Sequence, residues 1–285
     1  MADGEVIDGN AEAGGCSVPL SADVHPTQTL RPATRLRDGQ RAPGFECVAE
    51  EVPVAMVYNG LSHAVMLATP ADLEDFGLGF SLAEGIIDRR AELQDIEVAH
   101  HSGGIEVRMQ VTHRAFEALK ARRRSLAGRT GCGLCGVDSL AQVAREVKAV
   151  TARPAPAADA IHRAFSAMAD AQVLHKLTGA VHAAAWADLQ GGLIALREDV
   201  GRHNALDKLI GALADQGVDP ASGIALVTSR ASYEMVLKLA SFGGGLLAAI
   251  SAPTGLAIDL ANRAGITLCG FVRNGQKVIY SEPKH

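Results

Sequence analysis

The sequence predicts a protein of the α/β class, with helices alternating with the strands of a largely parallel sheet. Over the last hundred residues, five short apolar stretches typical of strands are separated mostly by segments with helical spacing. Residues 233–240 show this spacing, and so do Leu206, Leu209, Ile210 and Leu213. Such alternation favours parallel strands, because a parallel pair needs a long crossover connection that a helix can supply.

The predicted strands of this half are residues 181–186, 193–200, 224–228, 246–251 and 266–272. Four of them end in small or polar residues, and three of those ends carry an arginine. In open α/β sheets, ligands bind outside the carboxyl ends of the strands, where helix N-termini offer free N–H groups to anions. We therefore expect Arg202, Arg230 and Arg273 to lie near a phosphate-bearing ligand.

The N-terminal part divides into an expected tail and a β-rich portion. Residues 1–44 are rich in Pro, Gly, Ala, Asp and Thr without a sustained apolar period, so we expect a disordered tail before one folded domain over 45–285. Asn59–Gly60 is a hairpin signal between two strand-like stretches. The strand candidates are 52–58, 63–69, 96–101 and 105–112, and the helix candidates are 70–87, 114–124, 140–150 and 158–177.

Composition limits the classes of function. Of the 285 residues, 48% are hydrophobic and 21% charged, as in an ordinary soluble protein. The net charge of −5 and the aromatic content of 4% argue against a nucleic-acid partner. The N-terminus lacks the order of a signal peptide, and no apolar run is long enough to span a membrane. Five cysteines are few and odd in number, which favours the reducing cytoplasm.

The strongest local signal is a Cys-x-x-Cys motif in the glycine-rich loop 127–139. Upstream arginines favour the reactive thiolate of Cys132 and Cys135, and the flanking glycines predict a mobile loop. The motif can carry sulfur, hold zinc or cycle as a dithiol. Zinc requires two further ligands, which His182 and His203 can supply although no spacing demands it. A thioredoxin-like motif would open a helix directly after a strand, whereas an arginine-rich helix precedes this loop.

Residues 197–208 place many polar side chains at a predicted strand–helix junction. Asn204 can cap the helix and Asp207 suits its first turn. Packing gives no role to Glu198, Asp199, Arg202 or His203. We therefore interpret Arg202 as a ligand-binding residue and His203 as a group that handles protons or donates hydrogen bonds, because imidazole titrates near neutral pH.

Three segments together resemble the FdhD family of formate dehydrogenase accessory sulfurtransferases. They are Gly131–Gly136, which contains both loop cysteines, Arg197–Ile210, and Ala264–Arg273. The resemblance extends from about Phe45 to Tyr280 and includes the segment Asp72–Ile87. The chain departs from the family pattern at Ser229, where a glycine is expected.

The resemblance implies a function and a fold. Such proteins take persulfide sulfur from a cysteine desulfurase and pass it to the molybdenum cofactor, in its bis-guanine-dinucleotide form, before the cofactor enters formate dehydrogenase. The fold is similar to that of cytidine deaminases, a mixed sheet with flanking helices, and the protein is expected to be a homodimer. A deaminase itself is disfavoured because the chain has no His-x-Glu motif.

The resemblance also assigns residues. Cys132 would hold the persulfide and Cys135 would assist or relay it, with no structural metal. The guanine-dinucleotide cofactor, as bound substrate, would contact the loop formed by Phe271, Val272, Arg273, Asn274, Gly275 and Gln276, alongside Arg202, His203 and Arg230 at the other strand ends. A protein that binds the cofactor and is stabilised by zinc, without transferring sulfur, is the alternative.

Overall fold

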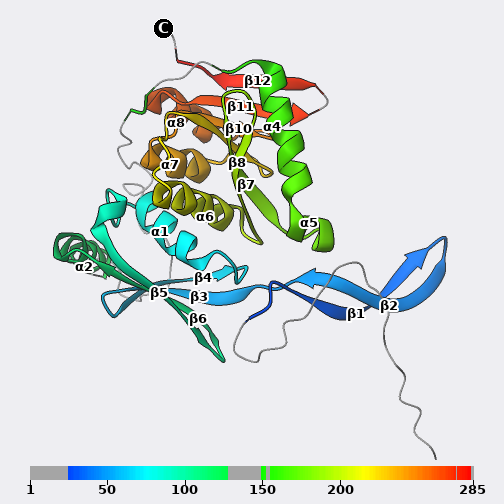
Figure 1. The fold of residues 1–285 in the computed structure, drawn as a ribbon, viewed down its shortest axis with the longest axis horizontal. Helices are drawn as coiled ribbons and strands as arrows, with labels where there is room; N and C mark the ends of the chain where they lie inside the picture. Colours follow the sequence, from blue (N-terminus) through cyan, green and yellow to red (C-terminus); the bar gives the residue numbers. More distant parts are fainter. Residues whose placement is uncertain (1–24, 128–148, 152–154, 274, 284–285) are drawn as a thin grey trace, which may run out of the picture.

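The computed structural model describes residues 25–127, 149–151, 155–273 and 275–283. Figure 1 shows a six-stranded sheet with helices, a smaller four-stranded sheet, and a two-stranded hairpin that projects from the body. No helix within these described ranges has the length and hydropathy needed to cross a membrane.

The N-terminal half forms the hairpin and the four-stranded sheet, whose strand order is β4-β3-β6-β5. Asn59 and Gly60 both have positive φ angles, of 47° and 80°, which is the turn that the Asn–Gly signal predicts between β3 and β4. The elements of this half are β1 (Gln28–Arg37), β2 (Gln40–Ala49), β3 (Val52–Tyr58), β4 (Leu61–Ala68), α1 (Leu73–Ala83), the 3-10 helix η1 (Arg90–Glu92), β5 (Leu93–His101), β6 (Gly104–Val111) and α2 (His113–Ala127).

The expected tail is wrong over residues 28–44, because β1 and β2 pair there as an antiparallel hairpin. Asp38 and Gly39 form its turn with φ angles of 52° and 80°, and Asp–Gly is a strong hairpin signal. A search for periodic apolar residues does not find these two strands, because most of their residues are exposed on both faces. Residues 1–24 lie outside the described residues.

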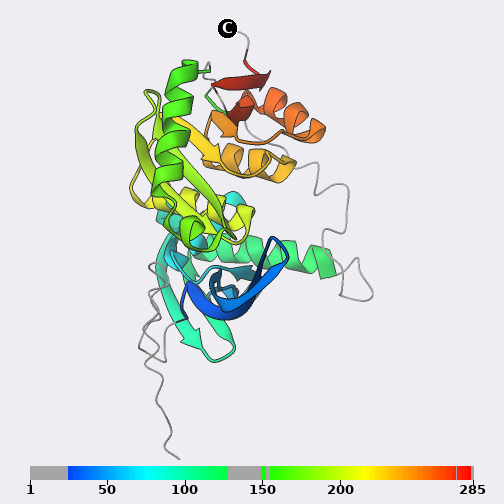
Figure 2. The same ribbon diagram turned by 90° about the vertical axis from the view of Figure 1, so that its right-hand side faces the viewer.

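The C-terminal half forms the six-stranded sheet, in the order β12-β11-β10-β9-β7-β8. Figure 2 shows α4 on one side of this sheet, with α7 and α8 on the other. The elements are α4 (Ala158–Ala171), α5 (Val173–Thr178), β7 (His182–Asp188), β8 (Leu193–Asp199), α6 (Arg202–Asp215), β9 (Gly223–Val227), α7 (Tyr233–Phe242), β10 (Leu246–Ala249), α8 (Gly255–Ala264), β11 (Thr267–Arg273) and β12 (Gln276–Ser281).

The sheet is mixed, so the α/β class and the mixed sheet with flanking helices are confirmed, but a largely parallel sheet is not. Only the pairs β9–β10 and β10–β11 are parallel, whereas β7–β8, β7–β9 and β11–β12 are antiparallel. The cause is the short connections between β7 and β8 and between β11 and β12, which leave no room for a crossover. Strand β12 was not predicted.

Two helix predictions need correction. The segment 158–177 is not one helix, because Gln172 has an extended backbone that separates α4 from α5. Helix α1 begins at Leu73, three residues after Pro70. Most of the predicted helix 140–150 lies outside the described residues.

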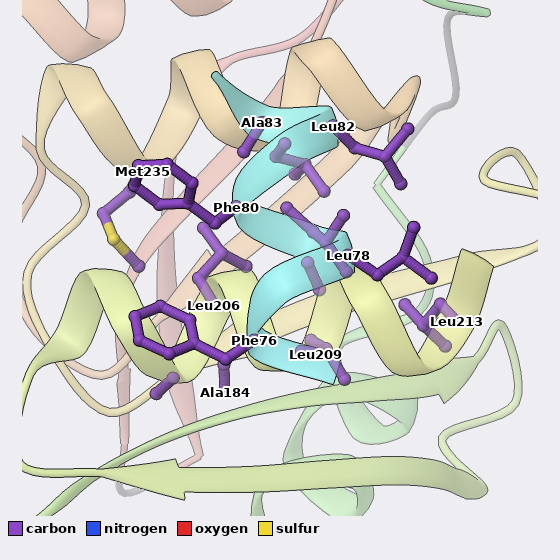
Figure 3. Close-up of a cluster of buried hydrophobic side chains, with 14 of the residues drawn as sticks. Phe76, Leu78, Phe80, Leu82, Ala83, Ala184, Leu206, Leu209, Leu213 and Met235 are labelled. Carbon is purple, nitrogen blue, oxygen red and sulfur yellow. The ribbon is translucent and has the colours of Figure 1, made fainter. Parts of the chain in front are cut away.

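Helix α1 joins the two halves of the molecule, because it packs between α6 and the four-stranded sheet, where Gly77 lies against Val107 and Ile96. Figure 3 shows the side chains of α1 beside those of α6. The close approach of α1 and α6 is clear from what a β-carbon would meet if it were added to a glycine at their contact. One at Gly79 would lie 1.7 Å from the carbonyl oxygen of Asp207, and one at Gly211 would lie 1.9 Å from that of Asp75. The two helices therefore touch through their backbones, which only glycine permits. This contact fixes the middle of α6 relative to the N-terminal half.

Candidate functional site

Four strands of the larger sheet end at one edge, which we call the carboxyl edge. Strands β9, β10 and β11 are parallel to one another, and β7 is antiparallel to both β8 and β9. It follows that β8 runs in the same direction as β9. The predicted strand ends with their arginines therefore meet at this edge, together with His182 at the start of β7.

Backbone contacts tie the loops of the carboxyl edge together. Ala231 and Pro253 form an isolated parallel bridge, and the Thr254 N–H donates to the Ala231 carbonyl at 3.0 Å. The Phe271 N–H donates to the Ser251 carbonyl at 3.2 Å. The loops after β9 and β10 and the end of β11 are thus connected by backbone contacts.

Two helices, α6 and α7, begin at this edge. Their N-cap residues, Gly201 and Ser232, make no side-chain cap hydrogen bond. The Oγ of Ser232, at the N-cap of α7, and the Nε of Arg202 are buried without a hydrogen-bond partner in the described part of the chain. Helix α8 differs, because Thr254 caps it by accepting from the Ala257 N–H. Unpartnered donors at two neighbouring helix N-termini form a site suited to an anion.

His203 lies in the first turn of α6, beside Glu234 of α7. Glu234 Oε2 is 2.7 Å from His203 Nε2, but Nε2 has no aligned hydrogen bond among the described residues. Burial is the largest cause that lowers the pKa of His203; Glu234 opposes it, and the positive charges of Arg202, Lys238 and Arg230 act in the same direction as burial. At neutral pH the ring is therefore uncharged and can accept a proton.

Phe271 is an exposed aromatic residue with an unusual backbone. Its φ angle is 51°, a left-handed conformation that is uncommon for a non-glycine residue and is often found at functional sites. The Arg273 guanidinium lies 5.6 Å from the centre of the Phe271 ring. An exposed ring beside an exposed guanidinium can stack a planar base and neutralise a phosphate.

The other residues of the predicted loop 271–276 differ in whether their side chains are exposed. Val272 is buried in the core between the sheet and α4, so its side chain is not available at the surface. Gly275 and Gln276 are exposed, and the Gln276 carbonyl lies 3.2 Å from His162 Nε2. Arg230 is exposed after β9, and Asn274 lies outside the described residues.

The expectation that packing gives no role to Asp199 is wrong, because Asp199 belongs to a buried structural network. Its carboxylate pairs with Lys208 Nζ at 2.7 Å, and neither side chain is exposed. It also accepts from the backbone N–H groups of Thr69 and Gly201 and from the Asn204 side chain. Lys208 donates to the Thr69 carbonyl at 2.8 Å. The network holds the β8–α6 junction to the end of β4.

Glu198 and Asn204 also have structural roles. Glu198 caps α5 by accepting from the N–H groups of Leu174 and His175, both at 2.8 Å. Asn204 is inside α6 rather than at its N-cap, which is Gly201. Of the four polar residues without an expected packing role, only Arg202 and His203 remain candidates for function.

Ser229 and Glu234 add to the sequence interpretation. The departure from the family pattern at Ser229 needs no glycine, because Ser229 is not among the described residues with positive φ and its Oγ donates to the Arg230 carbonyl at 3.0 Å.

Glu234 was not predicted at the site. Its sequence position resembles an ordinary acid in the first turn of α7, so only the contact with His203 reveals it.

The cysteines divide between described and undescribed parts of the chain. Cys132 and Cys135 lie outside the described residues, and the expected zinc ligands cannot be compared with them. Within the described ranges, no group of three or more His, Cys, Asp or Glu side chains is arranged to hold a metal ion. Cys269 is buried in β11, as expected, and burial raises its pKa to about 11, so it is an inert thiol.

The fold and the carboxyl edge define a mixed α/β protein in which arginines and helix N-termini gather at the strand ends. The FdhD/NarQ family model matches residues 49–285, and the chain belongs to that family. It is 57% identical to the sulfur carrier protein FdhD of Cupriavidus necator, covering 91% of this chain and 90% of that one. For the FdhD of Bordetella petrii the identity is 56%, with 83% and 85% covered. The expected family is confirmed.

A solved structure supports the same fold. A protein from Desulfotalea psychrophila, described as a formate dehydrogenase accessory protein, superposes with a TM-score of 0.71 at 25% sequence identity. The match covers 91% of this chain and 99% of that one, so it includes both halves of the molecule.

Proposed function

We propose that this protein is a sulfur carrier that serves formate dehydrogenase. It accepts sulfur from a cysteine desulfurase as a persulfide on Cys132, with Cys135 assisting. It then delivers that sulfur to the molybdenum cofactor in its bis-guanine-dinucleotide form, bound as substrate at the carboxyl edge, before the cofactor enters the dehydrogenase. The protein acts in the cytoplasm as a homodimer. The names of its relatives as sulfur carriers support the carrier role.

The loading step leaves atoms and electrons balanced. The Cys132 thiolate attacks the outer sulfur of the desulfurase persulfide, which breaks the S–S bond there and forms a new one on Cys132. The desulfurase cysteine leaves as a thiolate, so no external oxidant is needed. Arginines upstream of the loop favour the attacking thiolate.

The observation that carries the cofactor assignment is the gathering of anion-binding groups at one edge. Arg202, Arg230 and Arg273 come from three different strand ends, beside the N-termini of α6 and α7. Phe271 offers a ring to a guanine base, and its neighbour Arg273 offers charge to a phosphate. A guanine dinucleotide needs both, since it joins a planar base to a pyrophosphate.

Intact-mass spectrometry after incubation with a cysteine desulfurase and cysteine tests the carrier step. Wild type should gain the mass of one sulfur atom, which a thiol reductant removes, and Cys132→Ala should not gain it. Cys135→Ala should still load, whereas a dithiol cycle would need both cysteines equally. No gain in wild type, together with one bound zinc per chain, would instead support a zinc-stabilised cofactor-binding protein.

The same preparations test the cofactor site with guanosine diphosphate as the probe. Arg273→Ala should load sulfur normally but bind the probe roughly 10- to 100-fold more weakly, the loss expected for a hydrogen bond to a charged group. Arg163→Ala, on the exposed face of α4, is the matched control and should bind as wild type. Equal binding by Arg273→Ala would remove Arg273 from the proposed site.

A further inference from the structure

The β1–β2 hairpin, which we call the arm (Gln28–Ala49), has two faces of different character. On one face, Arg31 pairs with Glu50 at 2.7 Å, and Arg35 pairs with Glu46. The other face is mostly apolar, because successive side chains of a strand point to opposite faces. From the cross-strand register, its members are Leu30 and Cys47, Pro32 and Phe45, Thr34 and Pro43, and Leu36 and Arg41.

The apolar face of the arm is exposed along most of its length. Leu36 and Phe45 are 69% and 64% exposed, and the arm projects from the body (Figure 1). An isolated two-stranded hairpin is only marginally stable in water, so an arm of this length needs a surface that covers it. A shallow hollow on the arm can receive side chains of that surface; it is lined by Pro32, Ala33, Thr34, Pro43, Gly44 and Phe45.

A second exposed apolar surface lies on the outer face of the four-stranded sheet, the face directed away from α1. Val65 and Leu67 of β4 are 62% and 56% exposed there, whereas Met66 between them packs against the core. Their cross-strand partners on β3 are Ala55 and Pro53, which are also apolar. An exposed apolar patch of this kind marks an interaction site.

The arm does not cover the outer face of its own sheet. Only Glu50 and Glu51 connect β2 to β3, and the Glu50 N–H donates to the Thr27 carbonyl at the base of the arm. The arm therefore continues outwards from the end of the sheet (Figure 1). An arm that reaches this face must come from a second copy of the chain.

The charges beside the two surfaces have opposite signs. Arg37 and Arg41 are exposed at the tip of the arm, with Asp38 in the turn between them. On the outer face of the sheet, β5 at the edge opposite β4 carries Asp95 and Glu97, and the Glu97 side chain is 66% exposed. The charges of β6 between these edges form a Glu–Arg pair that is neutral overall. The positive tip thus complements the acidic edge.

The spacing of the apolar and charged residues also agrees on the two surfaces. Phe45 and Arg41 are four residues apart on β2, which is about 14 Å along a strand. Strands β4 and β5 are separated by β3 and β6, so they lie about 14 Å apart across the sheet. An arm that lies across the strands therefore places Phe45 on Val65 and brings Arg41 near Glu97 at the same time.

We propose that the arm of one copy packs its apolar face across the outer face of the four-stranded sheet of a second copy, with Phe45 against Val65 and the arginine tip beside the acids of β5. Each copy gives one arm and receives one, so the contact is formed twice about a twofold axis and closes at two chains. The inference deepens the homodimer of the proposed function and rests on it.

Sedimentation equilibrium of the full chain measures the dissociation constant of the dimer. Phe45→Lys and Val65→Glu should each raise it about 100-fold, because a homodimer of either variant loses an apolar anchor in both contacts. Both positions are largely exposed, so the variants should fold, and circular dichroism checks this. Ile194→Lys, at a 48% exposed position on β8, is the matched control and should associate as wild type.

Mixing the variants tests the exchange of arms directly. A dimer of Phe45→Lys with Val65→Glu has one unaltered contact and one that joins Lys to Glu, so the mixture should associate at least about tenfold more tightly than either variant alone. Phe45→Lys mixed with Val65→Lys joins like charges instead and should show no recovery. This pair of mixtures separates an arm–sheet contact from general weakening of the dimer.

Several results would overturn the proposal. A monomeric wild type would mean that residues 1–24 or a different protein cover the arm. An effect of Phe45→Lys without one of Val65→Glu would mean that arm packs on arm, and weakening by Ile194→Lys alone would place the interface on the larger sheet. Persulfide loading of the same preparations separates the two proposals: a monomer that loads sulfur refutes the exchanged arms alone, and an arm-linked dimer that does not load sulfur refutes the carrier function alone.

Discussion

Two lysines are buried among the residues that the structure describes, in similar places but in different networks. Lys208 lies 5.7 Å from the centre of the Phe76 ring, and Lys238 lies 5.6 Å from that of Phe80, one turn along α1. Each pairs with a buried aspartate at one face of this helix.

The networks differ in how fully they are satisfied. The Asp199 carboxylate accepts from three N–H donors in addition to Lys208. Asp207 has one oxygen without a partner among the described residues, and Lys238 reaches the half-exposed Glu84. The first network suits a fixed junction. The second contains an aspartate whose raised pKa allows it to change its protonation.

Breaking the first network should give the largest loss of stability. Lys208→Met leaves the Asp199 charge buried without its cation, which costs about 3–5 kcal/mol of unfolding free energy. Urea unfolding measures this loss. Lys176→Met, which removes an exposed lysine that donates only to the Asp170 carbonyl, is the matched control and should cost under about 0.5 kcal/mol. A small loss of unfolding free energy for Lys208→Met would mean that the Asp199 network, like the Asp207 network, tolerates a change of charge.

The second network should show its adaptability as a pH dependence. Burial raises the pKa of Asp207 to about 6, above the value of about 3.9 expected in the unfolded chain. Between these values the folded state holds a proton that the unfolded state has released, so the contribution of Asp207 to stability falls as pH rises and then levels off. The total change is up to about 3 kcal/mol.

Asp207→Asn lacks this titration. Its unfolding free energy relative to wild type should therefore rise between about pH 4 and pH 6 and stay constant above, apart from a fixed offset. Urea unfolding at several pH values measures the difference. A difference that is flat with pH would show that Lys238 keeps Asp207 ionised throughout, and the two networks would then be alike.

Glu198→Gln should give the smallest effect and sharpens the division between structure and function. Loss of the charged cap on α5 should cost about 1 kcal/mol. Binding of guanosine diphosphate, measured by calorimetry, should match wild type. Weaker binding of guanosine diphosphate with unchanged stability would show that Glu198 belongs to the binding site.

The sequence predicts much of the C-terminal half because its central strands β7, β9 and β10 are buried along almost their whole length and therefore form short apolar runs between helical segments. The apolar spacing of Leu206, Leu209 and Leu213 corresponds to buried positions of α6. The same test fails for β1 and β2, whose residues are mostly exposed on both faces. The direction of β7 depends on a short turn that strand–helix alternation does not report.

Part of the site could be predicted from the sequence because its arginines follow predicted strands. Arg202, Arg230 and Arg273 follow strands, so a rule about strand ends places them at one edge. Polar residues that serve the fold have the same appearance in sequence. Asp199 pairs across the molecule with Thr69, 130 positions away, and nothing local marks that contact. Glu234 is likewise recognised only by its neighbour on another helix.

The packing of α1 against α6 has a consequence for synthesis on the ribosome. Helix α1 buries Phe76, Phe80 and Leu82 in a core that includes α6, which is made about 120 residues later. At roughly 5–20 residues per second, this apolar face waits about 6–24 s for its partner. The nascent chain therefore carries an uncovered hydrophobic helix for much of its translation, and it is during this interval that chaperones have a binding site and aggregation competes with folding.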